Sequence, residues 1–152
     1  NPAVPQEMNE KVVGTKPLTA WGFAMGTKQT VLVIEDNDLN MEIVAAALEL
    51  WNYEVLQAAD AETGIQLALK HIPDLILMDI QLPGMDGYTA TRLIKRDRTI
   101  KDIPVVAMTT YAGKGGQEEA YRAGCSGFIN KPFSLDSFIE TVKGHLEQKG
   151  NP

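Results

Sequence analysis

Five polar residues stand at the ends of apolar runs and have the types needed to handle a phosphoryl group. Glu35 and Asp36 follow the first run, Asp79 follows another, Thr109 ends a third and Lys131 comes shortly after a fourth. Three carboxylates brought together repel one another, and a hard divalent cation such as Mg²⁺ relieves that conflict because it prefers oxygen ligands. A carboxylate beside such a cation is suited to forming an aspartyl phosphate, while an ammonium and a hydroxyl can hold phosphoryl oxygens.

These residues meet only if the apolar runs are neighbouring parallel strands. Short apolar runs alternate along the chain with longer segments of helical spacing, and two of the runs are apolar throughout, which is typical of a sheet covered on both faces. The predicted strands are Thr30–Ile34, Glu54–Gln57, Leu75–Met78, Val105–Met108 and Gly127–Ile129, and the predicted helices are about Leu39–Trp51, Ala61–His71, Tyr88–Lys95, Gly116–Ala123 and Leu135–Gln148. This order predicts a doubly wound α/β domain, whose functional crevice lies outside the carboxyl ends of the strands.

Residues that favour helix ends support the same division. Asp38, Asp60 and Ser134 stand where N-caps are expected, and Gly124 stands where a helix would end in a left-handed residue.

Four segments around the polar residues resemble response-regulator receiver domains, the CheY-like superfamily. The segments are Val31–Asn37, Pro73–Gly87, Pro104–Thr109 and Asn130–Pro132. The resemblance covers about Thr27 to Gln148 and implies a flavodoxin-like (βα)5 fold with a five-stranded parallel sheet in the order 2-1-3-4-5. The opening Glu–Asp–Asn–Asp–Leu–Asn from Glu35 is similar to DivK-type single-domain regulators and to hybrid-kinase receivers.

The domain boundaries expected from this resemblance are residues 27–149 for the receiver domain and residues 150–152 for a tail. Residues 1–26 are expected to be an N-terminal extension, linker or tag, and their alternative is a native extension that packs Trp21 and Phe23 on the domain.

On the phosphoryl side of the site, the resemblance implies a role for each matching residue. Asp79 is expected to accept the phosphoryl group, Lys131 to pair with its oxygens, and Thr109 to move in and bond one of them. Phe128 occupies the position of a switch aromatic, and a plain core position is the alternative. The Lys131–Pro132 bond is expected to be cis, a conformation that is affordable only before proline.

On the metal side, the resemblance implies Mg²⁺ as the cofactor. Asp36 and Asp79 are expected to bind the ion directly, together with the backbone carbonyl of Gln81, and Glu35 is expected to act through a water molecule.

The expected function is that of a two-component phosphorelay receiver that switches partner binding. A histidine kinase or histidine phosphotransfer protein is the expected donor, and Asn40 and Met41 are candidates for its docking site. A downstream protein is expected on the face made by residues 116–123, 127–129 and 135–148. We expect no catalysis beyond the domain's own phosphorylation and dephosphorylation.

Two alternatives to a native single-domain regulator are considered. The domain is alternatively a receiver excised from a hybrid histidine kinase. A Mg²⁺-dependent aspartyl phosphatase is less favoured, because that chemistry usually needs a general acid two residues beyond the nucleophile, where Gln81 stands.

Composition excludes several other classes of protein. The formal net charge of −6 argues against binding to nucleic acid or to an anionic membrane, since both need a basic surface. The single cysteine, Cys125, permits neither an internal disulfide nor a cysteine-based zinc site. No apolar run approaches the length of a membrane span and no signal peptide is evident, so we expect a cytoplasmic location.

Overall fold

The computed structural model describes residues 28–110 and 114–150 of the 152-residue chain. The predicted extension at residues 1–26, with Trp21 and Phe23, lies outside the described residues, as do residues 151–152 of the predicted tail.

Five strands alternate with five helices along the described chain. The strands are β1 (Thr30–Ile34), β2 (Glu54–Ala58), β3 (Leu75–Asp79), β4 (Val105–Thr109) and β5 (Gly127–Asn130). The helices are α2 (Asp38–Leu50), α3 (Ala61–His71), α4 (Gly87–Arg96), α5 (Lys114–Ala123) and α6 (Leu135–Gly150). Each strand begins at its predicted residue, and every strand except β1 runs one residue further than predicted, so that Asp79 and Thr109 are the last residues of their strands.

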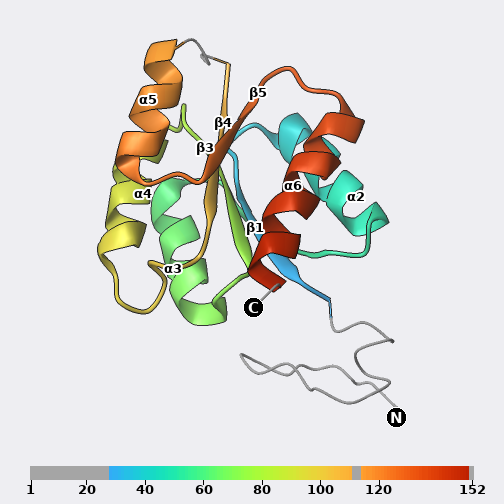
Figure 1. Cartoon of the computed structure of the whole chain (residues 1–152), viewed down its shortest axis with the longest axis horizontal. Coiled ribbons are helices and arrows are strands. Elements are labelled where there is room, and N and C mark those ends of the chain that lie inside the picture. Colours follow the sequence, from blue (N-terminus) through green and yellow to red (C-terminus); the bar gives the residue numbers. More distant parts are fainter. Residues whose placement is uncertain (1–27, 111–113, 151–152) are drawn as a thin grey trace.

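The sheet has the order β2-β1-β3-β4-β5, and every neighbouring pair of strands is parallel. The strand order and fold class implied by the family resemblance are therefore confirmed. Because all five strands point the same way, their carboxyl ends lie at one edge of the sheet. The segments that follow β1, β3, β4 and β5 meet at that edge (Figure 1).

Two apolar layers hold the helices on the sheet. Helices α2 and α6 cover one face, while α3, α4 and α5 cover the other (Figure 1). Alternate residues of the central strands point into the two layers, with Val31 and Val33 on the α2–α6 side and Leu32 and Ile34 on the opposite side. All of β1 after its first residue, and all of β3 and β4, is buried, which explains why these strands are apolar without alternation.

The beginning of α2 differs by one residue from the prediction. Asn37 is the N-cap, since its side-chain Oδ1 accepts a hydrogen bond from the backbone N–H of Asn40 at 2.8 Å. Asp38 is instead the first helical residue, where its negative charge favours the helix dipole. Both side chains can cap a helix, so residue type alone did not distinguish the two positions.

The other predicted helix ends are confirmed. Asp60 accepts a hydrogen bond from the backbone N–H three residues later at 2.8 Å, and Ser134 does the same at 3.1 Å. Gly124 follows α5 with a φ of +114°. In the described ranges, every helix is too short or too polar to cross a lipid bilayer.

Candidate active site

Asp79 is a buried carboxylate at the carboxyl end of the central strand β3. The residue is only 3% exposed, although it stands at the open edge of the sheet. Its Oδ1 accepts a hydrogen bond from the backbone N–H of Gln81 at 3.0 Å, and its Oδ2 lies 3.3 Å from Nζ of Lys131. One oxygen is thus fixed by the backbone and the other faces a positive charge.

Glu35 is the second buried acid of the site and the principal partner of the lysine. The residue is 2% exposed, and its Oε1 accepts a hydrogen bond from Nζ of Lys131 at 2.9 Å. Its Oε2 accepts a hydrogen bond from the backbone N–H of Asn37 at 3.1 Å. Both oxygens of Glu35 therefore accept hydrogen bonds from within the protein.

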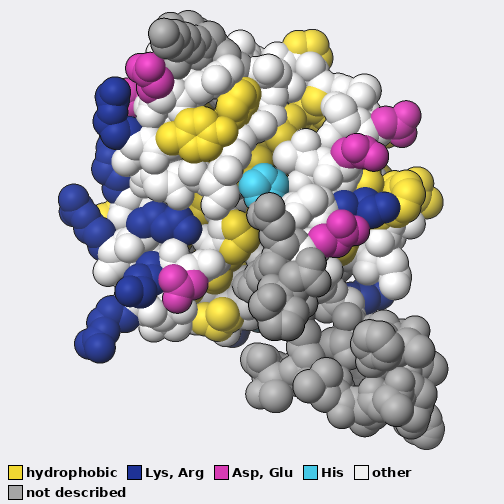
Figure 2. Space-filling model, viewed as in Figure 1, with side chains coloured by type: hydrophobic (Ala, Val, Ile, Leu, Met, Phe, Trp, Pro, Cys, Tyr) yellow, Lys and Arg dark blue, Asp and Glu magenta, His cyan; other side chains and the backbone are white. Residues whose placement is uncertain are grey.

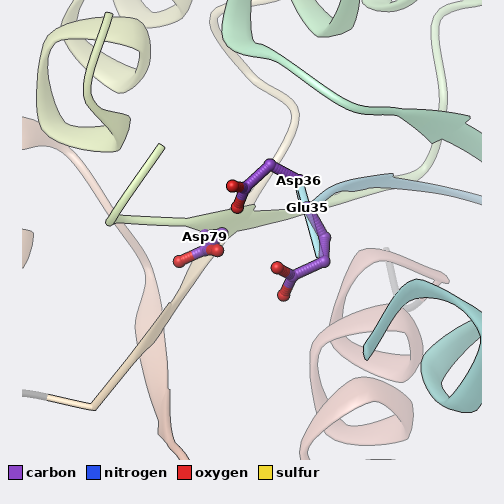
Figure 3. Close-up of side chains that lie close together, drawn as sticks. All are labelled: Glu35, Asp36 and Asp79. Carbon is purple, nitrogen blue, oxygen red and sulfur yellow. The ribbon is translucent and has the colours of Figure 1, made fainter. Parts of the chain in front are cut away.

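Asp36 completes a group of three carboxylates. One ligand oxygen from each of Glu35, Asp36 and Asp79 lies within 4.8 Å of the others. The three side chains extend from the ends of β1 and β3 toward a common space, and only Asp36 is exposed to solvent (Figure 3). An all-oxygen donor set of this kind suits Mg²⁺, which binds through one or two carboxylates and keeps several waters.

Burial and crowding shift the pKa of both Asp79 and Lys131. Burial, followed by the hydrogen-bonding and charge of Glu35, raises the pKa of Asp79 from 3.8 to about 6, against the opposing effects of the Gln81 backbone N–H and of Lys131. Burial by itself lowers the pKa of Lys131, but the hydrogen bond to Glu35 and the charge of Asp79 outweigh it, so the pKa is raised above 10.5. Lys131 is therefore a permanent cation, whereas Asp79 retains a proton more readily than an ordinary aspartate.

Thr109 and Lys131 reach the site from two adjacent strand ends. Thr109 is 3% exposed, and its carbonyl accepts a hydrogen bond from the backbone N–H of Lys131 at 2.8 Å. The Lys131–Pro132 bond is cis, as predicted. The structure thus brings Glu35, Asp36, Asp79, Thr109 and Lys131 to one end of the sheet.

Gln81 contributes a feature that the sequence reasoning missed. The prediction concerned its backbone carbonyl, but its side-chain Oε1 also accepts a hydrogen bond from the hydroxyl of Thr110 at 3.1 Å. The strand register contains the signal that could have located this pair. Asp79 lies opposite Met108 in the parallel ladder, which brings the segments that follow β3 and β4 next to each other.

Phe128 lies on β5 away from the carboxylates. Its ring is half-buried against the core under α4 and α5, and its centroid is 6.1 Å from that of Tyr121 in an edge-to-face arrangement. The ring therefore contributes to packing at this position.

The two predicted docking residues on α2 differ in their exposure to solvent. Met41 is 8% exposed and packs in the core between α2 and the sheet, so its side chain is not part of the docking surface. Asn40 is half-buried at the beginning of the helix. The exposed apolar residues nearby are Leu39 and Ile43, which are 64% and 43% exposed. The helical period of 3.6 residues explains this difference in exposure, because residues one or two positions away from Met41 lie on a different side of the helix.

Comparison with known families agrees with this geometry. The family model described as the response regulator receiver domain matches residues 31–143. The chain belongs to the response regulator receiver family. The matched range includes β2 to β5, β1 from its second residue, and all of the polar residues described above, so the resemblance inferred from the sequence is confirmed.

Relatives and solved structures of receiver proteins share most of the chain. The polar-differentiation response regulator DivK of Brucella ovis is 42% identical over 118 residues, which are 78% of this chain and 96% of that protein. The receiver domain of a sensor histidine kinase from Pseudomonas aeruginosa, determined with a magnesium ion coordinated in its active-site cleft, is 31% identical with a TM-score of 0.74. That comparison covers 80% of this chain and 99% of the other. The chemotaxis protein CheY4 of Vibrio cholerae is 26% identical with a TM-score of 0.76, over 79% of this chain and all of that chain.

Proposed function

We propose that this receiver domain accepts a phosphoryl group on Asp79 from a phosphohistidine. The supporting observation is a buried carboxylate that has a lysine Nζ 3.3 Å away and two further carboxylates beside it at the open end of the sheet. In the proposed transfer, a carboxylate oxygen of Asp79 forms the new O–P bond while the N–P bond of the donor histidine breaks. The histidine nitrogen keeps the electron pair of that bond and takes a proton from solvent.

The side chains around Asp79 have separate tasks in this transfer. The ammonium of Lys131 balances charge on the phosphoryl oxygens, and the hydroxyl of Thr109 donates a hydrogen bond to one of them. Glu35 holds Lys131 by the bond at 2.9 Å, which orients the ammonium.

Asp36, Asp79 and the carbonyl of Gln81 would hold Mg²⁺, with Glu35 acting through a water. The bound ion supplies neutralisation of the carboxylates and of the charge that develops on the transferred group.

The donor is proposed to be a histidine kinase or a histidine phosphotransfer protein that docks on α2 beside the acidic pair. Leu39 and Ile43 are one turn apart on the exposed side of this helix, and the charged residues of α2 are all acidic. A partner that fits this surface presents apolar side chains flanked by Lys or Arg. Lys and Arg side chains of this chain gather instead on the opposite side of the molecule, over α4, at the left of Figure 2.

The output is proposed to be a change in binding on the face formed by α5, β5 and α6. Phosphorylation replaces the single negative charge of the Asp79 carboxylate with a phosphoryl group that carries roughly two, and its oxygens draw the hydroxyl of Thr109 inward and change the connection between β4 and α5. Phe128 is part of this face, on β5 beside β4, and would repack with Tyr121. The ring of Phe128 has no hydroxyl, so only packing contacts can stabilise it in an inward orientation. We further propose that the domain works in the cytoplasm and turns over no phosphoryl group except its own.

The test of this function is incorporation of ³²P from labelled acetyl phosphate in the presence of Mg²⁺. The wild-type chain is expected to take up one acid-stable, base-labile label per molecule, and Asp79→Asn is expected to take up none. Asp102→Asn is the matched control, because Asp102 is an exposed aspartate that precedes β4, at the end of the strand opposite to Thr109, and should label normally. Label that persists in Asp79→Asn would refute the assignment of the phosphoacceptor.

A further inference from the structure

The last turns of α4 and the turn that follows it carry a dense group of basic residues. From Arg92 to Asp102 the chain has five Lys or Arg residues and two aspartates, although the formal net charge of the whole chain is −6. Figure 2 shows Lys and Arg side chains gathered at the left of the molecule, over α4. Charge is therefore distributed unevenly, and a local positive surface stands on an acidic protein.

Two of the five cations are engaged within the protein. Nη2 of Arg92 lies 3.3 Å from Oε2 of Glu119 on α5. Nζ of Lys95 donates hydrogen bonds to the carbonyl of Lys101 at 3.0 Å and to that of Ile103 at 2.7 Å. Arg92 thus joins two helices, and Lys95 joins α4 to the turn before β4.

The other three cations are exposed and make no such contact. In residues 28–110 and 114–150, no ion pair or side-chain hydrogen bond involves Arg96, Arg98 or the ammonium of Lys101. Arg96 is the last residue of α4, where a positive charge favours the helix dipole, but this effect falls off within the last turn. Arg98 and Lys101 lie beyond the helix, so the dipole does not account for them.

The turn after α4 is held in a defined conformation. Ile100 and Ile103 are 0% and 3% exposed and anchor the turn in the core. The N–H of Thr99 donates to Oδ1 of Asp97 at 2.8 Å, and the N–H of Lys101 donates to the carbonyl of Asp97 at 2.9 Å. A bound anion would meet cations on a fixed backbone, which lowers the entropy cost of binding.

An exposed leucine adjoins the cations. Leu93 is 41% exposed and precedes Arg96 by three positions, so the two side chains lie on the same side of α4. We call Leu93, Arg96, Arg98 and Lys101 the α4 basic surface. An apolar side chain beside several cations suits a partner that offers both carboxylates and an apolar group.

The charge of the whole molecule favours a short acidic protein segment over a long polyanion. Exposed charges interact over about 10 Å at 0.1 M salt, so a short segment senses mainly the local cations. A nucleic acid or an anionic membrane extends further and also meets the acidic remainder of the surface. The phosphate groups of a polyanion offer no apolar contact for Leu93.

We propose that the α4 basic surface binds an acidic segment of a partner protein, with Asp or Glu side chains on the three cations and an apolar side chain on Leu93. Helix α4 begins beside Asp79 and ends at Arg96, ten residues and about 15 Å further on. Helix α2, the proposed docking site of the donor, lies on the other face of the sheet (Figure 1). The partner can therefore stay bound while Asp79 meets its donor, and the inference does not depend on the proposed phosphorylation.

The experiment titrates the full chain with a short synthetic peptide of Asp and Glu that has one central Leu. Binding is followed by the backbone ¹H–¹⁵N signals of the protein and by the fluorescence anisotropy of a labelled peptide. The signals of the α4 basic surface are expected to shift, and the affinity is expected to fall as salt concentration rises. A peptide with Asn and Gln in place of Asp and Glu is the neutral comparison and should bind at least tenfold more weakly.

Two double variants with the same change in net charge locate the contact. Arg98→Gln/Lys101→Gln is expected to weaken binding of the acidic peptide by about threefold to tenfold, the scale of two exposed ion pairs. Lys28→Gln/Lys143→Gln is the matched control, because these residues precede β1 and lie in α6, and it should bind like the wild type. All four side chains lie outside the core, so the melting temperatures should stay close to that of the wild type.

Two single variants separate charge from apolar contact. Asp102→Asn removes an exposed acid next to Lys101 and is expected to tighten binding about twofold. Leu93→Ala is expected to weaken binding by a similar factor at every salt concentration, because an apolar contact is not screened by ions.

Several results would overturn the proposal. These are a lack of binding by the acidic peptide, shifts confined to other residues, and equal losses in the two double variants. An oligothymidylate or a phosphatidylserine vesicle that binds the same residues as tightly as the acidic peptide would show that the surface recognises polyanions in general, and would overturn the assignment to a protein segment. Labelling of Asp79 is measured separately and does not affect any of these outcomes.

Discussion

At the scale of single residues, the protein does not by itself compensate all the negative charge of the site. Three carboxylates share one ammonium, and two of these carboxylates are nearly inaccessible to water. Lys131 lies closer to Glu35, at 2.9 Å, than to Asp79, at 3.3 Å. The negative charge of Asp79 is therefore the least compensated buried charge of the group, and its raised pKa reports this.

The raised pKa of Asp79 gives a prediction for stability against pH. Between pH 3.8 and about 6 the folded state holds a proton that the unfolded state has lost, so the free energy of unfolding falls as pH rises through this window. Above pH 6, the ionised Asp79 lowers the free energy of unfolding by at most about 3 kcal/mol. In a chelator, Asp79→Asn should have a higher free energy of unfolding than the wild type at pH 7.5 and should lack this decline, as measured by urea denaturation from pH 4 to 7.5.

Asp102→Asn serves as the control for this titration. It removes a carboxylate that is exposed, and it should keep the wild-type decline. If Asp79→Asn shows the same decline as the wild type, the titrating group is not Asp79.

Residue types predicted the members of the site but not the state of each side chain. Glu35, Asp36, Asp79, Thr109 and Lys131 could be selected because each follows or ends an apolar run. Packing decides which oxygen of Glu35 contacts Lys131. Packing also decides that Met41 is buried while Leu39 is exposed. A sequence pattern read without a fixed helix phase leaves such details open.

At the scale of elements, α4 must come unusually close to the end of β3, and a glycine allows it. The N–H of Gly87 donates to the carbonyl of Ile80 at 3.1 Å. A Cβ at this position would lie 2.6 Å from the carbonyl oxygen of Asp79 and 2.8 Å from Cα of Ile80. These are backbone atoms, so a side chain at residue 87 must displace either the helix or the backbone of Asp79 and Ile80.

Gly87→Ala is therefore predicted to lower both stability and labelling. The expected loss is about 1–3 kcal/mol, the usual cost of overpacking, and Asp79 should be labelled more slowly because its backbone moves. Gly144→Ala in α6 is the matched control, because its Cβ would meet nothing within 4 Å. Alanine there should be neutral or should stabilise by about 0.5–1 kcal/mol, from helix propensity. Thermal denaturation and acetyl-phosphate labelling of both variants measure these effects, and equal behaviour of the two would contradict the close-approach argument.

The exposed apolar side of α2 gives a prediction about the donor. Ile43→Glu should slow transfer from a purified, histidine-phosphorylated partner by roughly tenfold or more, because a buried apolar contact is replaced by a charge beside an already acidic helix. Labelling by acetyl phosphate should not change, since a small donor needs no docking surface. Leu69→Glu, at an equally exposed apolar residue of α3, is the control. Equal losses with both donors would show that Ile43 acts through the site and not through docking.

At the scale of the whole molecule, the alternating strand and helix pattern was enough to predict the architecture. Apolar runs that do not alternate require burial on both faces, and helices joining successive strands require them to be parallel. The order of the strands is different, because pattern alone does not say which strands are neighbours. That order came from the family resemblance, and it places β1 and β3 together at the centre, where Asp36 and Asp79 can meet.

The placement of the acidic group at one end of the sheet couples metal binding to the stability of the whole domain. Folding brings together carboxylates from β1 and β3, which are far apart in the unfolded chain, so Mg²⁺ should bind the folded state selectively. Binding to the folded state alone stabilises it by about 2.7 kcal/mol when the ion is at one hundred times its dissociation constant.

The melting temperature of the wild type should therefore rise with Mg²⁺ concentration at constant ionic strength. In Asp36→Asn this rise should be largely lost, because one proposed ligand carboxylate becomes a neutral amide, while the starting stability in a chelator should be equal or higher. Asp136→Asn, an exposed aspartate in the first turn of α6, should respond to Mg²⁺ like the wild type. An equal rise in Asp36→Asn and in the wild type would mean that Mg²⁺ stabilises the domain at another site. The three carboxylates would then repel one another in the folded state with no bound metal ion to offset their charge.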